Sequence, residues 1–144
     1  MNGLRGLADI LLVRNQSNDA LPYLLESIAI LGDLGDMANE AISWQIVASI
    51  YERYKDRWNE AVKAWDQVRK LAQRLNDLPR QLNAVEGMAR NIRLGGGDSA
   101  GALSHLQEAH RLATKLKKRE DAGRFLNSMA IIEWERQHYD NALS

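Results

Sequence analysis

Residues 44–72, WQIVASIYERYKDRWNEAVKAWDQVRKLA, carry two apolar stripes separated by a more polar connection. In each stripe the apolar residues recur three and four positions apart, which places them on one face of an α-helix. The first stripe is Trp44, Val47, Ala48 and Tyr51, and the second is Ala61, Trp65, Val68 and Ala72. The stretch therefore predicts two amphipathic helices joined by a short turn.

The same arrangement returns along the chain at intervals of about 41 residues. Four alanines that each open an apolar run are spaced by 41, 41 and 40 residues, and a second set is spaced by 40, 41 and 41. The first set is Ala20, Ala61, Ala102 and Ala142, and the second is Ala8, Ala48, Ala89 and Ala130. A small side chain at a fixed place lets two helices approach closely. The repeat therefore predicts helix pairs stacked on helix pairs.

The pattern between the alanines is helical throughout, with no sustained strand-like alternation. Turn-forming residues cluster near 15–18, 32–36, 76–79 and 95–98. We expect helices over residues 2–14, 18–33, 37–55, 57–76, 79–94, 98–117 and 120–137, with another starting near 139. The chain is then one all-α domain, 1–144, with repeats of about 1–36, 37–77, 78–118 and 119–144, the last one truncated.

Composition narrows the classes of function. The chain has 19 Lys+Arg, 19 Asp+Glu and no cysteine among 144 residues. Zero formal net charge argues against a general nucleic-acid or anionic-membrane binder, because such binding needs an excess of Lys and Arg. The lack of cysteine excludes disulfides, thiolate metal sites and cysteine nucleophiles. No apolar run approaches the ~20 residues that cross a bilayer, and the N-terminus lacks a signal-peptide pattern, so we expect a cytoplasmic protein.

Residue spacing argues against catalysis and against a metal or cofactor. His105 and His110 are five residues apart, roughly 140° around a helix, and so do not share a face as metal ligands would. The glycine-rich segment 95–98 is not followed by Lys-Ser/Thr, so it predicts a turn, with Asp98 or Ser99 capping the next helix. No nucleophile–base spacing stands out. We expect no metal, no cofactor and no enzyme activity.

These residues resemble the tetratricopeptide repeat family. Its signature of an aromatic, Leu-Gly, Tyr, Ala and an aromatic is matched by Trp44, Val47-Ala48, Tyr51, Ala61 and Trp65, and more loosely in the other copies. The family's usual period is 34 residues, and the longer period here is similar to the variant in bacterial regulators and kinesin light chains. The resemblance covers essentially the whole chain. It implies a right-handed α-solenoid of about 3.5 antiparallel helix pairs that binds a peptide or a partner helix without catalysis.

In this family the first helix of each pair lines a concave groove. Carried over by register, the groove residues are Arg5, Asp9, Leu12, Gln45, Ser49, Glu52, Arg53, Asn83, Glu86, Arg90, Arg93, Arg124, Asn127, Ile131 and Trp134. The surface is locally basic around Arg90, Arg93 and Arg124, which suits acidic side chains or a peptide C-terminus. The alternative is that these arginines only pair with Glu52, Glu86 and other neighbours.

Two details of the resemblance bear on specificity. Some members clamp the C-terminal carboxylate of chaperone tails with a fixed set of Lys, Arg and Asn residues, but this chain differs there at Arg5, Asp9 and Ile46. The tryptophan at groove position 134 suits either an interface anchor or packing against a following helix. The other three tryptophans, Trp44, Trp58 and Trp65, are expected to be structural.

The sequence ends about one turn into what should be the second helix of the fourth repeat. The apolar face of helix 120–137, with Leu126, Met129, Ala130 and Ile132, would then lack its partner. We expect either that the chain is a fragment of a longer protein or that a second copy covers this face. Homo-oligomerisation through the terminal repeat, by exchange of end helices or otherwise, is one alternative function. A regulatory array attached to an enzyme domain outside this chain is another.

Overall fold

The computed structural model describes residues 17–143, so the expected helix 2–14 lies outside the described residues. Residues 17–143 form six α-helices, one 3-10 turn and no strand. The elements are α2 Ser17–Leu34, α3 Met37–Tyr51, η1 Lys55–Arg57, α4 Trp58–Arg74, α5 Leu78–Leu94, α6 Ser99–Lys115 and α7 Arg119–Leu143. The prediction of an all-α chain is confirmed over this range.

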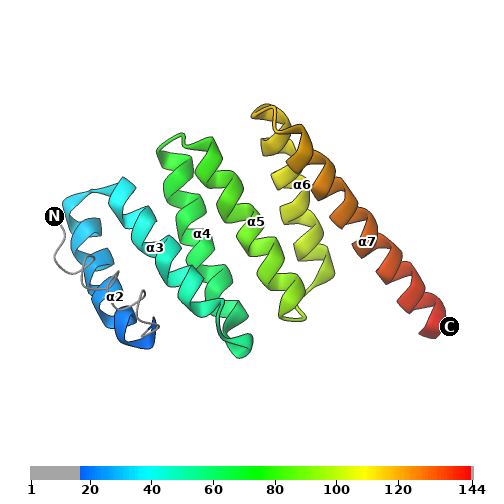
Figure 1. Cartoon of the computed structure of the whole chain (residues 1–144), viewed down its shortest axis with the longest axis horizontal. Helices are drawn as coiled ribbons and strands as arrows, with labels where there is room; N and C mark the ends of the chain where they lie inside the picture. The colour runs from blue at the N-terminus through cyan, green and yellow to red at the C-terminus, as the bar shows by residue number, and fades with distance from the viewer. Residues whose placement is uncertain (1–16, 144) are drawn as a thin grey trace.

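The helices lie side by side in chain order along the long axis of the molecule, from α2 at one end to α7 at the other (Figure 1). Each helix packs mainly against the helix before it and the helix after it in the sequence. The order of the apolar stripes along the chain therefore sets the order of the helices in space.

The buried apolar residues form two clusters, and α5 contributes to both. Ala84 and Met88 of α5 belong to the cluster built with α2, α3 and α4. Leu82, Val85 and Ala89 belong to the cluster built with α6 and α7. Because these two groups lie on different faces of one helix, α5 is covered on both sides.

The alanines that mark the repeat lie at the helix contacts. Five of them are at most 1% exposed: Ala20, Ala48, Ala61, Ala89 and Ala102. Ala130, on α7, is exposed instead. Ala8 and the side chain of Ala142 lie outside what the structure describes. Five of the repeated alanines therefore lie between packed helices, and Ala130, on the last described helix, does not.

The 41-residue period also appears in the backbone, at the turns after α2, α4 and α6. The residue in left-handed conformation is Gly35 (φ 73°), Asn76 (φ 55°) and Lys117 (φ 61°) in turn. The next amide donates to a carbonyl five residues back: Asp36 to Leu31 (3.0 Å), Asp77 to Ala72 (2.9 Å) and Lys118 to Ala113 (2.8 Å). This pattern satisfies carbonyls that would otherwise be unpaired at a helix end. All three turns thus have one geometry.

Aspartates cap three of the helices that follow turns. Asp36 accepts from the amide of Asn39 at 3.2 Å, and Asp77 accepts from that of Arg80 at 3.2 Å. Asp98 accepts from the amide of Ala100 at 3.0 Å, which confirms the predicted turn and selects Asp98 as the cap. Each carboxylate satisfies an orphan donor of a first helical turn and lies at the favourable end of the helix dipole.

Two predicted boundaries are wrong. The helix expected over 37–55 ends at Tyr51, because the chain turns there through η1 before α4 begins at Trp58. Within this turn the Arg57 guanidinium lies over the ring of Tyr51, 5.7 Å from its centroid. The helix expected over 120–137 instead continues to Leu143, with no new start near 139. Residues 134–143 contain neither Gly nor Pro. Once a helix exists, each further residue adds a hydrogen bond at little cost, so it continues where nothing stops it.

Candidate functional site

Two pockets lie between alternate helices of the row. The first, of about 450 Å³, lies between α3 and α5 and is lined by Ile42, Gln45, Ile46, Ser49, Ile50, Arg53 and Arg80. The second, of about 520 Å³, lies mainly between α5 and α7 and is lined by Glu86, Ala89, Arg90, Arg93, Leu94, Leu106, Arg124, Phe125, Ser128 and Glu135. We call the surface formed by these two linings the groove.

The residues predicted from the sequence divide into three sets. Those lining a pocket are Gln45, Ser49, Arg53, Glu86, Arg90, Arg93 and Arg124. Those outside both linings are Glu52, Asn83, Asn127, Ile131 and Trp134. Arg5, Asp9 and Leu12 lie outside the described residues. The structure thus gathers seven of the fifteen predicted groove residues into the two pockets.

Sequence reasoning missed the apolar floor of the first pocket and part of the second. Ile42, Ile46 and Ile50 follow each other at intervals of four, which places them along one line of α3. That spacing was a usable signal, but the stripe resembles ordinary core packing, and Ile50 is indeed 1% exposed. Arg80 and Glu135 lie on α5 and α7, which were predicted to line the groove, but at positions that the register did not mark.

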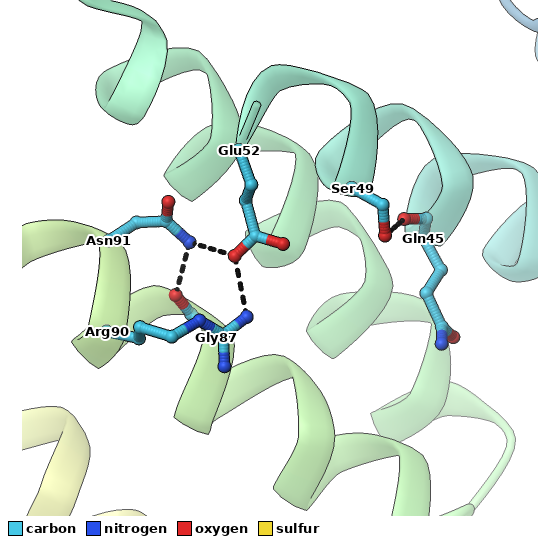
Figure 2. A network of polar contacts seen from close by, with 6 residues as sticks. All are labelled: Gln45, Ser49, Glu52, Gly87, Arg90 and Asn91. Carbon is cyan, nitrogen blue, oxygen red and sulfur yellow. Dashed lines mark hydrogen bonds and ion pairs between the residues drawn. The ribbon is translucent and has the colours of Figure 1, made fainter. Parts of the chain in front are cut away.

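A polar network joins α3 to α5 at one side of the groove (Figure 2). Arg90 Nη2 donates to Glu52 Oε2 at 2.6 Å, and Asn91 Nδ2 donates to the same oxygen at 2.6 Å. Asn91, only 4% exposed, also donates to the carbonyl of Gly87 at 2.7 Å. A buried amide is costly unless it is hydrogen-bonded, so Asn91 holds Glu52 and fixes how α3 meets α5.

A second ion pair joins α5 to α7. Arg124 Nη1 donates to Glu86 Oε2 at 2.6 Å, and Nη2 donates to Asp121 Oδ1 at 3.1 Å. These hydrogen bonds, the one to Glu86 first, raise the pKa of Arg124 above its ordinary value. The guanidinium also lies over the ring of Phe125 at 4.9 Å, which keeps it at the pocket wall. The alternative in which these arginines pair with neighbouring carboxylates therefore holds for Arg90 and Arg124.

Arg93 differs from the other two arginines. Its side chain is exposed and lines the second pocket. Within residues 17–143 it has no hydrogen bond or ion pair. Glu135 lines the same pocket from α7 and likewise has no ion pair in the described part of the chain. One positive and one negative group therefore face the pocket without a partner.

The tryptophans separate into buried and exposed positions. Trp65 is 6% exposed in the first core cluster, and a β-carbon placed on Gly87 would come within 2.6 Å of its ring. Trp58 lies closer still to Gly95, so it packs on the turn after α5. Trp134 is 63% exposed and stacks on His138, with ring centroids 5.0 Å apart. The structural assignment suits Trp58 and Trp65, whereas Trp134 lies on the surface.

A separate cluster of titratable residues lies on α4 and α6, outside both pockets. Burial would raise the pKa of Asp66, but hydrogen bonds and charge from Arg69 and Lys70 together lower it. Burial, and then the charge of Arg69, lower the pKa of His105 against the opposing pull of Glu108 and Asp66. These ion pairs tie neighbouring turns together on a surface that lines neither pocket.

Two features of residues 17–143 bear on metal binding and on membrane insertion. No group of three or more His, Asp or Glu side chains there is arranged to hold a metal ion. None of the helices in that range combines the length and the apolar character needed to cross a bilayer. Comparison with known protein families and with curated proteins finds no match for the chain.

Proposed function

We propose that this chain is a non-catalytic protein-interaction scaffold of the tetratricopeptide-repeat type. In this proposal the helices are antiparallel pairs of a right-handed solenoid, in which α3, α5 and α7 are the first helices of successive pairs. The groove binds a peptide or a partner helix, and the protein acts in the cytoplasm.

The observation that carries the proposal is the repetition of pockets along one set of helices. Pockets of about 450 and 520 Å³ lie in successive intervals between α3, α5 and α7. The Glu52–Arg90 and Glu86–Arg124 ion pairs bridge the same two intervals. Two adjoining pockets suit an elongated ligand better than a compact one, because each can take one side chain of a continuous segment.

The scaffold would bind with little loss of conformational freedom. Its groove helices are fixed by two core clusters and by polar contacts between alternate helices. A surface that is ordered before binding loses less entropy on association, so more of the contact energy appears as affinity. Most of the conformational entropy lost on binding would then be that of the flexible peptide.

Site-directed photo-crosslinking tests the proposal, because the chain has no cysteine of its own. A photoreactive group is attached to Ser49→Cys in the first pocket and, as a matched control, to Ser104→Cys on α6. Both serines are exposed, and Ser104 lines neither pocket. We expect discrete protein adducts from cell extract at position 49 and not at 104. The same adducts at both positions, or none at 49, would contradict the groove.

Self-association is a second candidate function, favoured by the surface of α7. Leu126 is 50% exposed, Trp134 is 63% exposed, and Ala130 between them is exposed as well. These residues lie four positions apart along one line of the helix. Two copies of α7 crossing antiparallel at Ala130 would place Leu126 of each copy against Trp134 of the other, a self-complementary contact.

Light scattering across a concentration series tests this second function. We expect a dimer that Leu126→Arg converts to monomer. The matched control is Leu34→Arg, which places the same charge on another exposed leucine, 74% exposed at the end of α2. A wild-type monomer at every concentration, or equal loss of dimer in both variants, would exclude the α7 contact.

A further inference from the structure

The charge of the groove differs from that of the chain. The whole sequence has as many acidic as basic side chains, 19 of each. Five arginines and two glutamates line the two pockets, a formal excess of three positive charges. A pocket lining with an excess of one sign of charge attracts partners of the opposite sign and speeds their association.

The excess charge is not spread evenly over the five arginines. Arg90 and Arg124 each hold a carboxylate of this chain at 2.6 Å. Arg80 is 3.6 Å from Asp77, too far for a strong hydrogen bond. Arg93 alone among the second pocket's arginines has no carboxylate within ion-pair distance in residues 17–143. Its five donors are therefore available to a ligand carboxylate.

Each pocket places an apolar floor beside its arginines. In the first pocket the floor is Ile42, Ile46 and Ile50. In the second pocket it is Ala89, Leu106 and Phe125, and Phe125 is 1% exposed. A ligand that fills both pockets needs apolar side chains for these floors and carboxylates for the arginines at their edges.

On the basis of the proposed groove function, we propose that its ligand is an internal acidic segment of a partner protein. Two apolar side chains of the segment enter the two pockets, and an adjacent Asp or Glu binds Arg93. Acidic side chains fit better than a C-terminal carboxylate, because a single terminal group needs several convergent donors. Here Arg90 already holds Glu52, and Arg124 already holds Glu86 and Asp121.

Glu135 sets the direction of the ligand in the second pocket. It lines the pocket from α7, opposite the α5 side that carries Arg93. A ligand carboxylate on the α7 side would meet like charge, so the acidic residue lies on the α5 side. Removal of the Glu135 charge would lessen this repulsion and strengthen binding of acidic ligands.

Fluorescence anisotropy with synthetic peptides of equal length tests the inference on the full chain. The first peptide alternates Leu or Phe with Asp and Glu and has an amidated C-terminus. The second replaces Asp and Glu with Asn and Gln, and the third replaces them with Lys. The fourth is the neutral peptide with a free C-terminal carboxylate. All four are titrated at low and at high salt.

We expect the acidic peptide to bind about tenfold more tightly than the neutral one, and more weakly at high salt. Arg93→Glu should weaken that binding on the order of fivefold, and Glu135→Gln should strengthen it. The matched control is Arg111→Glu, which reverses an exposed arginine of α6 that lines neither pocket. This control should bind as the wild type does.

Three results would overturn the inference, and they separate it from the proposed function. Equal binding of acidic and neutral peptides, both lost in Ile46→Asp, would leave a groove that does not select acidic segments. Tight binding only of the peptide with a free carboxylate would indicate recognition of chain ends. Equal weakening by Arg93→Glu and Arg111→Glu, or binding of none of the peptides, would show that the groove does not bind acidic segments. The crosslinking result would then still decide whether the groove binds a partner at all.

Discussion

Helices α5 and α7 carry related residues 41 positions apart, yet their surroundings differ. Val85 and Ala89 of α5 are 0% and 1% exposed because α6 covers them. The matching Leu126 of α7 is 50% exposed, and Ala130 is exposed as well. The adjoining faces, with Ala84 in α5 and Phe125 in α7, are both buried. The apolar stripe therefore marks where a helix can be covered, and the neighbouring helix decides whether it is.

The largest expected difference between α5 and α7 is the loss of stability when an apolar side chain of this stripe is truncated to alanine. Val85→Ala should lower the free energy of unfolding by about 2 kcal/mol, because it removes buried methyl groups and leaves a cavity. Leu126→Ala removes more atoms but should cost less than about 1 kcal/mol, because half of that side chain is already in water. Denaturant unfolding at low protein concentration measures both. Equal costs would mean that the face of α7 is covered after all.

The second difference concerns the close approach of α5 to α4. Gly87→Ala should lower stability by about 1 kcal/mol net, because its new methyl group would lie 2.6 Å from the buried ring of Trp65, while alanine favours the helix. The control is Ser128→Ala at the matching place in α7, where we expect a change within about 0.5 kcal/mol. Thermal unfolding of both variants checks this. A stabilised Gly87→Ala would show that the ring can move aside.

The third difference concerns the ion pairs that join α5 to α3 and to α7. Double-mutant cycles should give a coupling of about 0.5–1 kcal/mol for Glu52–Arg90 and a smaller one for Glu86–Arg124. Glu52 is also held by buried Asn91, whereas Arg124 can fall back on Asp121 when Glu86 is lost. Both couplings should decrease with salt. A larger coupling for the α7 pair would reverse this order.

The smallest expected effect concerns α6, which separates the two helices. The unfolded state binds a proton at His105 near its ordinary pKa of 6.5, whereas burial and Arg69 lower the pKa in the folded state. Between these values the unfolded state binds more protons, so this contribution to stability is present above pH 6.5 and is lost as the pH falls through the folded pKa. The His105→Gln variant should not lose this contribution to stability as the pH falls. His110→Gln keeps His105 and should retain it, as denaturant midpoints above and below pH 6.5 would show.

Much of the fold could be predicted because helical stripes and turn residues are local signals. The alanine spacing identified contact positions at five alanines but not at Ala130, and the three glycines placed the next helix cap at Asp98 or Ser99, of which the structure selects Asp98. The end of α3 at Tyr51 was not predictable in this way, because it depends on how the chain turns through η1 to Trp58. Helix α7 continues to Leu143 because no Gly or Pro stops it, whereas the repeat period predicted a new helix near 139. Lys117 gave no sign of its left-handed backbone, since lysine has no preference for it.

The candidate site was predictable only in outline. Register along the groove helices found Arg90, Arg93 and Arg124, but it could not say that two of them already hold carboxylates 38 residues away. Those pairs depend on the distance between alternate helices, which is a property of the packed structure. The apolar floors were missed for a related reason: a sequence does not distinguish an isoleucine facing the core from one facing a pocket.

The turns that follow α2, α4 and α6 share one backbone path although they contain Gly35, Asn76 and Lys117. A chain shortened by residues 36–76 would join Gly35 directly to Asp77, an aspartate that caps its helix as Asp36 does. The joint would be chemically the same before and after the cut. Deletion of two helices at this joint would therefore leave its backbone path and its capping aspartate unaltered, so the row of helices could change in length by two while this connection stays constant.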